Sequence, residues 1–309
     1  GNSGHAGSIA GSGDVAGALI SGCLIEDTYS YGSVNGVTIK QEIFKTWGAA
    51  FRLNGSQLNQ STGLSWINVD DAAGAIYPVL TDGALAAAEN WETPAKAVED
   101  GVIGEKPTGT PYQISTAEQL AWFAKQINDG ALPANTGAVL TDNLDLAGSS
   151  YVASGKLAWV PIGKEASRAY KGKFQSSTGN SKLYQIQNLY VNTTGEAGLF
   201  GVLDTGAGIS EIGIAGASVT GETAGGVAGL LKGSAEISRC YNRENSAITG
   251  TACAGGIAGQ LTNSGAVKDC YNMETIIKST GSSSYAGGIA GNGGAGSIRN
   301  CYNACRTGG

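Results

Sequence analysis

Two short motifs recur in phase along the C-terminal part of the chain, and this repetition constrains the fold more than any other feature. A Gly-Gly-(Val/Ile)-Ala-Gly motif occupies residues 225–229, 255–259 and 287–291. A Cys-Tyr-Asn motif follows each copy, at 240–242, 270–272 and 301–303. Successive Cys residues are 30 and 31 positions apart. A period near 30 residues fits either a pair of helices or one coil of a β-solenoid.

The glycine content separates these two possibilities. Of the 309 residues, 50 are Gly, and each Gly inside a helix costs about 0.5–1 kcal/mol relative to Ala. A collagen-like chain is excluded because Gly does not occupy every third position and only 6 residues are Pro. Short β-type segments alternate with Asn, Ser, Thr and Gly turns. The sequence therefore predicts an all-β chain that folds as a parallel β-helix, in which each coil buries its apolar face against its neighbours.

The offsets within the repeat predict which side chains point inward. Ile237, Val267 and Ile298 each precede the repeat Cys by three residues, and on an unbroken strand this odd offset places the two side chains on opposite faces. Because free Cys is among the most buried residue types, we expect a bend that turns both inward. The predicted structural ladder consists of Cys240, Cys270, Cys301, Asn242, Asn272 and Asn303, with the Asn amides stacked at turns. The adjacent tyrosines, which would then face outward as a strip for ligand contact, are Tyr241, Tyr271 and Tyr302.

The cysteines allow two interpretations. Six Cys in a secreted chain would ordinarily suggest disulfides, but a column of three cannot pair completely. We expect stacked free thiols, and Cys301 with Cys305, or Cys253, are the candidates for a bridge. No metal site is predicted, because the chain has no Cys-x-x-Cys motif and His5 is its only histidine.

Charge divides the chain unevenly, since residues 1–106 carry 5 basic and 12 acidic residues and residues 107–309 carry 14 and 13. Pro107 and Pro111 flank a short linker-like stretch, so we expect one unit over residues 1–106 and a β-helix over 107–309. Ser115 and Glu118 match a capping box that opens a helix over residues 115–129, with apolar residues at helical spacing. Such a helix would cover the open end of the solenoid, where unpaired strands would otherwise recruit other chains.

Several segments of the second unit follow one another in the order typical of one family. They are Tyr-Gln-Ile at 112–114 with the helix after it, Asn-Leu-Asp-Leu at 143–146, Trp-Val-Pro-Ile-Gly at 159–163, Gly-Lys-Phe at 172–174, Asn-Leu-Tyr-Val at 188–191, Gly-Leu-Phe-Gly at 198–201 and the Cys-Tyr-Asn series. Residues 111–309 thereby resemble the GLUG-motif modules of bacterial surface and adhesin-like proteins, which also occur beside the peptidase domains of some secreted proteases. The chain departs from that pattern at Gln175-Ser176, where such modules usually carry Asp-Gly. The resemblance implies a right-handed β-helix at the cell surface and implies no particular ligand.

The first unit carries weaker signals. Residues 9–11 (Ile-Ala-Gly) and Cys23 are similar to one degenerate coil, and the stretch from Phe44 to Leu80 is similar to the segment that closes such modules. Residues 84–89 are Ala-rich and predict a short helix. One hypothesis is that residues 1–26 stack on the chain's own last coil near 287–303. The alternative is an independent small β unit.

Charge and residue types exclude several functions. With 19 basic and 25 acidic residues the net charge is −6, which argues against nucleic acid or an anionic membrane surface as a partner. No apolar run approaches the ~20 residues of a membrane span. Ser-His-Asp catalysis lacks its His. Glycoside hydrolysis needs two carboxylates at one site, and the coil carboxylates share no repeat position; these are Glu211, Glu222, Glu236, Glu244, Asp269 and Glu274.

These observations favour an extracellular, non-catalytic, adhesin-like or spacer module of a bacterial surface protein. It would need no cofactor and would present a flat repeat face to an unidentified glycan or to a host or bacterial surface protein. The main alternative is a carbohydrate-active enzyme on the same scaffold, a polysaccharide lyase or glycosidase. A purely architectural module without a ligand is the third possibility.

Overall fold

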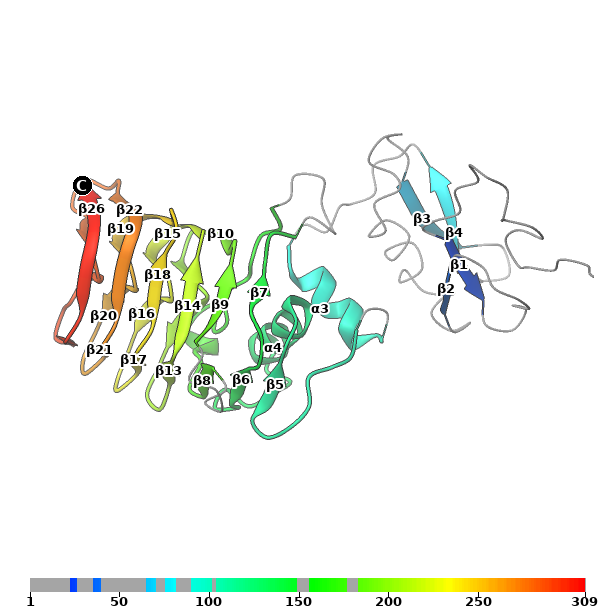
Figure 1. Ribbon diagram of the computed structural model, residues 1–309, viewed down its shortest axis with the longest axis horizontal. Coiled ribbons are helices and arrows are strands. Elements are labelled where there is room, and N and C mark those ends of the chain that lie inside the picture. The colour runs from blue at the N-terminus through cyan, green and yellow to red at the C-terminus, as the bar shows by residue number, and fades with distance from the viewer. Residues whose placement is uncertain are drawn as a thin grey trace, which may run out of the picture.

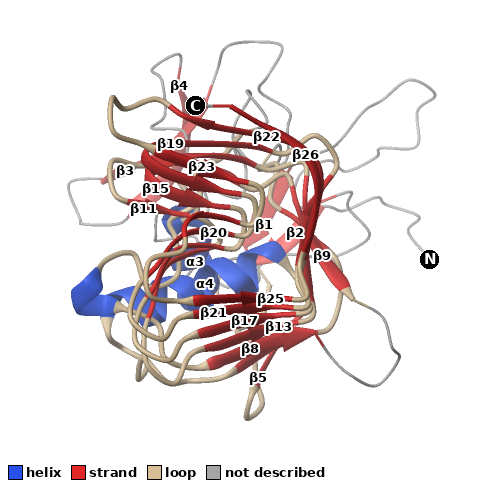
Figure 2. Cartoon of the chain, turned by 90° about the vertical axis from the view of Figure 1, so that its left-hand side faces the viewer, coloured by secondary structure: helices blue, strands red, loops and turns tan. Residues whose placement is uncertain are grey.

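The chain forms a parallel β-solenoid closed at one end by two helices (Figure 1). This computed structural model describes residues 23–26, 36–39, 65–70, 76–81, 90–101, 104–148, 156–176 and 183–308. Strands that are about one repeat apart in sequence pair in parallel, so the predicted all-β, solenoid fold is confirmed. Seen along the stack, the sheets surround the interior, and the helices lie across its far end (Figure 2).

Three parallel sheets make up the walls of the coils. The first has seven strands: β5 (Tyr112–Ile114), β6 (Ala138–Leu140), β8 (Lys173–Ser176), β13 (Gly208–Ser210), β17 (Glu236–Ser238), β21 (Ala266–Lys268) and β25 (Ser297–Arg299). The second has four: β12 (Phe200–Leu203), β16 (Ala228–Leu231), β20 (Ala258–Leu261) and β24 (Ala290–Asn292). The third has eleven: β7 (Leu144–Asp145), β9 (Tyr184–Gln187), β10 (Tyr190–Asn192), β11 (Glu196–Ala197), β14 (Ile212–Ala215), β15 (Ser218–Gly225), β18 (Tyr241–Arg243), β19 (Ala247–Gly255), β22 (Tyr271–Ser279), β23 (Tyr285–Gly287) and β26 (Tyr302–Gly308).

The strand register explains the sequence period. Ile237 pairs with Val267, and Val267 pairs with Ile298. Ala258 of the glycine motif pairs likewise with Ala228 below it and Ala290 above it. One repeat is therefore one coil, and equivalent residues of successive coils lie directly over one another.

The expected bend before each repeat Cys is present. Arg239, Asp269 and Asn300 have φ values of 52°, 54° and 52°. This left-handed conformation reverses the direction of the backbone and forms a corner of the coil. The reversal turns both flanking side chains inward: Ile237 and Cys240 are completely buried, with 0% exposure. The alternating in-out pattern of a strand is thus interrupted at this corner.

This corner yields a first testable expectation. Asp269→Gly should change the free energy of unfolding by less than about 0.5 kcal/mol, because Gly adopts positive φ freely. Asp269→Val should destabilise by about 1–2 kcal/mol, because a β-branched side chain is strained there. Urea unfolding measures both, with Lys268→Val on the adjoining strand as a control that should stay near wild type. Equal stabilities for the two Asp269 variants would contradict this account of the corner.

The glycine motif and the Cys-Tyr-Asn motif recur in phase because the second Gly of one packs directly against the Asn side chain of the other. A Cβ atom on Gly226 would overlap the side chain of Asn242, and one on Gly256 would overlap that of Asn272. The same relation joins Gly288 to Asn303. The second Gly of each pair therefore leaves the room that the inward-pointing Asn of the same coil occupies.

The helical cap is confirmed, with a correction at its start. The helix α4 spans Ala117–Asp129, and its N-cap is Thr116, whose hydroxyl accepts from the Gln119 N–H at 3.2 Å. Ser115 is not the N-cap. Gln119 rather than Glu118 completes the box, since its Oε1 accepts from the Ser115 N–H at 2.9 Å. Sequence could not place the cap, because Ser115 and Thr116 are both good caps and each has a Glu or Gln three residues later.

A second helix joins the cap from the other side of the expected 106/107 boundary. The helix α3 spans Glu92–Glu99 and packs against α4. Its residues Ala95 and Val98 belong to the same apolar core as the coils. The short 3-10 helix η2 (Ala166–Arg168) lies beside α4. The cap is therefore built by residues on both sides of the proline-rich linker.

The core continues from the cap into the first coils as a cluster of aromatic rings. Phe123 of α4 lies with its ring centroid 6.2 Å from that of Tyr170 and 6.1 Å from that of Phe174. Both of these rings contact Phe200 of β12, at 5.3 and 5.4 Å. Large aromatic rings fill the core next to the cap, whereas Ile, Val, Leu, Ala and Cys fill the later coils.

Four further strands lie in the N-terminal part of the chain. β1 (Cys23–Glu26) pairs in parallel with β2 (Gly36–Ile39), and β3 (Ser65–Asp70) pairs antiparallel with β4 (Ile76–Thr81). The helix predicted at 84–89 lies outside the described residues. Figure 1 places β1 beyond the helical cap, at the opposite end of the molecule from β26. The hypothesis that the start of the chain stacks on its own last coil therefore fails for β1, the part of that segment that the structure describes.

Candidate functional site

The tyrosine column is the candidate site on the outer surface of the coils. Its members come from five successive coils and pair in register, in the order Gln185, Gly213, Tyr241, Tyr271 and Tyr302. All lie on the outer face of the third sheet, next to the inward-facing column that contains Asn242 and Asn272. The column thus faces away from the core, as the sequence predicts.

The rings of this column pack on one another. Tyr241 and Tyr271 stack with centroids 4.9 Å apart and planes 8° from parallel. The Tyr241 hydroxyl accepts from the Gln185 amide at 2.8 Å, and the Arg243 guanidinium lies 5.3 Å from the Tyr241 centroid. Gly213, between Gln185 and Tyr241, leaves room for the ring, since a Cβ there would overlap it. Burial and the neighbouring Tyr241 raise the pKa of Tyr271.

The expected strip of three solvent-facing rings is therefore wrong in part. Tyr241 is only 5% exposed, Tyr271 is half-buried, and Tyr302 is 61% exposed. The spacing between coils is close to the stacking distance of aromatic rings, so neighbouring rings cover one another's faces. The ring surface available for a ligand is concentrated at Tyr302 and at the edge of Tyr271.

The thiol column behaves as a structural ladder. The thiols of Cys240, Cys270 and Cys301 donate to the carbonyl oxygens of Ser238, Lys268 and Arg299, at 3.3, 3.1 and 3.2 Å. Hydrogen bonding with Cys240 and burial raise the pKa of Cys270, and burial raises that of Cys301. A thiol held protonated is a poor nucleophile. Cys253 and Cys305, with the three of the column, are free thiols in the structure.

The asparagine ladder differs from the expected turn stack. Asn242 and Asn272 lie on strands β18 and β22, point inward and are completely buried. Asn272 donates to Asn303 Oδ1 at 3.0 Å, but Asn242 donates to the Gly256 carbonyl instead, also at 3.0 Å. The column continues below Asn242 with Ile214, which offers no donor, and Asn242 Oδ1 has no hydrogen-bond partner. The hydrogen-bonded ladder therefore joins Asn272 to Asn303 and does not extend to Asn242.

The expectation that the coil carboxylates share no repeat position is wrong for one pair. Glu244 and Glu274 each follow the repeat Cys by four residues, and both have positive φ. Glu211 pairs with Arg239 at 2.9 Å, Glu236 with Lys268 at 2.9 Å, and Glu244 with Arg243 at 2.8 Å. Asp269 accepts from Asn300 at 3.1 Å. Across the described ranges, no group of three or more His, Cys, Asp or Glu side chains is arranged to hold a metal ion. These four carboxylates therefore form ion pairs or hydrogen bonds with residues of the same coil or of a neighbouring coil.

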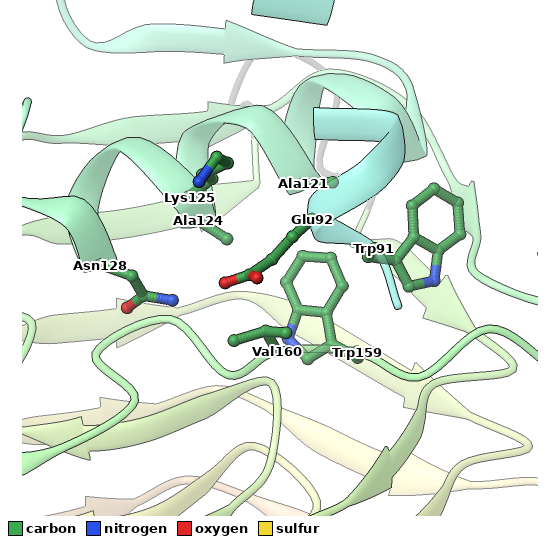
Figure 3. A pocket seen from close by; sticks show the side chains of 8 residues that line it. All are labelled: Trp91, Glu92, Ala121, Ala124, Lys125, Asn128, Trp159 and Val160. Atoms are coloured by element: carbon green, nitrogen blue, oxygen red, sulfur yellow. The ribbon is translucent and has the colours of Figure 1, made fainter. Parts of the chain in front are cut away.

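A shallow pocket marks the seam between the helices and the first coils (Figure 3). Its lining is Trp91, Glu92, Ala121, Ala124, Lys125, Asn128, Trp159 and Val160. Its volume of about 10 Å³ admits no more than about one water molecule. Asn128 uses both ends of its amide on the coil, donating to Pro161 O at 2.9 Å and accepting from the Gly163 N–H at 2.9 Å. The seam therefore fastens the cap and leaves no space for a larger ligand.

Glu99 holds the two helices and the linker together. Its carboxylate accepts from Lys106 at 2.7 Å, from the Trp122 indole N–H, and from Gln126 at 3.3 Å. The hydrogen bonds from Lys106 and Trp122 hold the pKa of the Glu99 carboxyl below its usual range. A carboxyl group whose pKa is lower in the folded state than in the unfolded state stabilises the fold at pH values above the unfolded-state pKa. This stabilisation is lost as the pH falls through the folded-state pKa.

We therefore expect the cap to weaken in acid. Between pH 6 and pH 3 the thermal midpoint of the wild type, followed by Trp fluorescence, should fall further than that of Glu99→Gln, which starts lower and cannot titrate at this position. Glu105→Gln, which removes an exposed neighbouring carboxylate, should behave like the wild type. Parallel pH curves for the wild type and Glu99→Gln would contradict the role of this carboxylate.

Comparison with known proteins adds little to this geometry. None of the described helices has the length and apolar character needed to cross a membrane. No protein-family model matches the chain, and no curated protein is significantly similar to it. One solved structure that shares similarity is described as a "putative immunoglobulin A1 protease from Bacteroides ovatus", with 24% identity, a TM-score of 0.48 and coverage of 63% of this chain. This chain spans 57% of that protein's length, and the likeness implies nothing about what this chain binds or cleaves.

Proposed function

We propose that the chain is an extracellular, non-catalytic module of a bacterial surface protein, adhesin-like or a spacer, which presents a flat repeat face to a glycan or to a host or bacterial surface protein. The observation that carries the proposal is the unbroken register of the outer columns over successive coils. Such a stack is a stiff rod with equivalent side chains at regular spacing, which suits several weak contacts acting together. The resemblance of residues 111–309 to GLUG-motif modules supports the same placement at the cell surface.

The contact surface we favour lies at Tyr302 and the adjoining edge of Tyr271. Tyr302 has a large exposed ring and pairs in register with Tyr271, whose ring stacks on that of Tyr241. An aromatic face of this kind packs against a sugar ring or an apolar side chain of a partner. The buried, hydrogen-bonded Tyr241 then serves as the support of the column rather than as a contact.

A binding array tests this proposal. The immobilised chain should bind members of a glycan or surface-protein array, and Tyr302→Ala should weaken that binding at least about tenfold, or by 1.4 kcal/mol. Tyr285→Ala removes an equally large exposed ring, 56% exposed, from β23 and serves as the matched control. If the chain binds no member of the array even at high protein concentration, the adhesin form of the proposal is wrong and the spacer form remains.

Catalysis is the outcome that would overturn both forms of the proposal. A lyase or glycosidase would shorten polysaccharides in solution, and chromatography of the products would show this. Depolymerisation that persists after every single Asp or Glu substitution on the coils would instead indicate a contaminating enzyme, which a mock purification identifies.

A further inference from the structure

The sulfur atoms of the thiol column repeat with the coils. Each thiol of Cys240, Cys270 and Cys301 contacts the carbonyl oxygen of the residue two positions earlier, at 3.3, 3.1 and 3.2 Å. Each also contacts the carbonyl oxygen of the Ile or Val in the preceding coil, at 3.8, 3.8 and 3.7 Å. Because these contacts are the same in every coil, neighbouring sulfur atoms are one coil spacing apart, about 4.8 Å.

This spacing does not suit a disulfide. A disulfide needs Cβ atoms about 3.5–4.5 Å apart, whereas the Cβ atoms of equivalent residues in successive coils are about 4.8 Å apart. The stacked backbone holds Cys240 and Cys270 at this separation, since the Tyr271 N–H donates to the Cys240 carbonyl oxygen at 3.1 Å. Both side chains are free thiols in the structure. A bridge would have to pull two hydrogen-bonded coils together.

The same spacing fits two thiolates on opposite sides of one metal ion. Metal–thiolate bonds are about 2.3 Å long, so a linear sulfur–metal–sulfur unit spans about 4.6 Å. Structural zinc takes four ligands, and across the described parts of the chain no third His, Cys, Asp or Glu side chain joins an adjacent pair of thiols in a metal-binding group. Soft monovalent ions such as Cu(I) and Ag(I) prefer sulfur and are stable with two ligands in line.

The surroundings of Cys270 suit a metal-bound sulfur. Its Sγ accepts from the Cys240 backbone N–H at 3.4 Å, and such a hydrogen bond strengthens when the sulfur carries a negative charge. Cys240 and Cys270 are buried, and so are Ile237 and Val267 in the adjoining inward column. An apolar shell of this kind keeps water and competing ligands away from a bound ion.

We propose that the thiol column binds a soft monovalent cation, Cu(I) or Ag(I), in line between the sulfur atoms of Cys240 and Cys270. On binding, two S–H bonds break, two sulfur–metal bonds form, two protons pass to the solvent, and no electron is transferred. Cys270 and Cys301 have the same geometry, so Cys270 belongs to both adjacent pairs. The ion enters by local opening of the coils. This site is independent of the outer tyrosine column and of any partner that the column contacts.

Competition with a chelator tests the proposal on the full chain. After long anaerobic incubation with Cu(I) and bathocuproine disulfonate, the wild type should retain at least one Cu(I) ion. Cys270→Ala and Cys270→Ser should each weaken retention at least about hundredfold, because Cys240 and Cys301 are then two coil spacings apart, about 9.6 Å. Cys253→Ala removes a buried thiol of β19 outside the column and should bind like the wild type. Circular dichroism checks that each variant is folded.

X-ray absorption of the copper-loaded wild type gives a second measurement that needs no variant. The spectrum should show two sulfur neighbours around the copper and no nitrogen or oxygen neighbour. Zn(II), which requires more ligands than one pair of thiolates supplies, should be removed by a chelator that leaves Cu(I) in place. A wild type that loses Cu(I) as readily as Cys270→Ala, three or more ligands in the spectrum, or Zn(II) held as tightly as Cu(I) would each overturn the proposal.

Discussion

Replacing Gly256 with Ala should destabilise the protein by about 3 kcal/mol, the upper end of what overpacking usually costs. The added methyl group would overlap the buried Asn272 side chain and the Gly288 carbonyl oxygen of the next coil. Neither neighbour can move easily, because Asn272 is hydrogen-bonded to Thr275 and Asn303 and the carbonyl belongs to the stacked backbone. Urea unfolding monitored by circular dichroism measures the effect.

Two further variants isolate the cause. Gly195→Ala should be neutral within about 0.5 kcal/mol, since nothing lies within 4 Å of a Cβ there. At Gly288 the nearest atoms to an added Cβ all belong to the Asn303 side chain, so Asn303→Ala should relieve most of the cost of Gly288→Ala in a double-mutant cycle. Additive losses in that cycle would show that the glycine and the asparagine do not share one space.

Replacing Phe123 with Ala should cost about 3–5 kcal/mol, as large-to-small substitutions of a buried aromatic ring do. Phe123 is completely buried and its ring contacts those of Tyr112, Tyr170 and Phe174. The remaining cavity would separate α4 from the first coils. We therefore expect hydrogen exchange to rise first in α4 and in β5 and β6, and last in the coils around Cys240.

The matched control for this prediction lies two residues away on the same helix. Lys125→Ala removes only a partly exposed ion pair with Asp129, at 2.7 Å, and such pairs contribute about 0–1 kcal/mol. Equal losses for Phe123→Ala and Lys125→Ala, or a uniform rise in exchange along the whole solenoid, would show that the cap is not fastened by its aromatic core.

The repeat predicted the solenoid because its period and its glycines act locally and identically in every coil. The inward position of Cys240, the bend at Arg239 and the outward side of Tyr241 all follow from offsets within one repeat. The cap over residues 115–129 was predicted to within two residues of α4 for a similar reason, since capping residues and helical spacing are local signals.

The exposed surface of the candidate site depends on contacts between coils. Residue offsets within one repeat do not predict these contacts. Tyr241 is covered because Gly213 and Gln185, from the two preceding coils, receive its ring and its hydroxyl. The docking of α3 on α4 likewise rests on Glu99 reaching Trp122 and Lys106. Offsets within one repeat thus fix the coil, its period and the face that each repeat residue takes, because backbone geometry sets all three. Which of the outward side chains remain exposed follows from the folded stack, because it depends on the neighbours that stacking brings close.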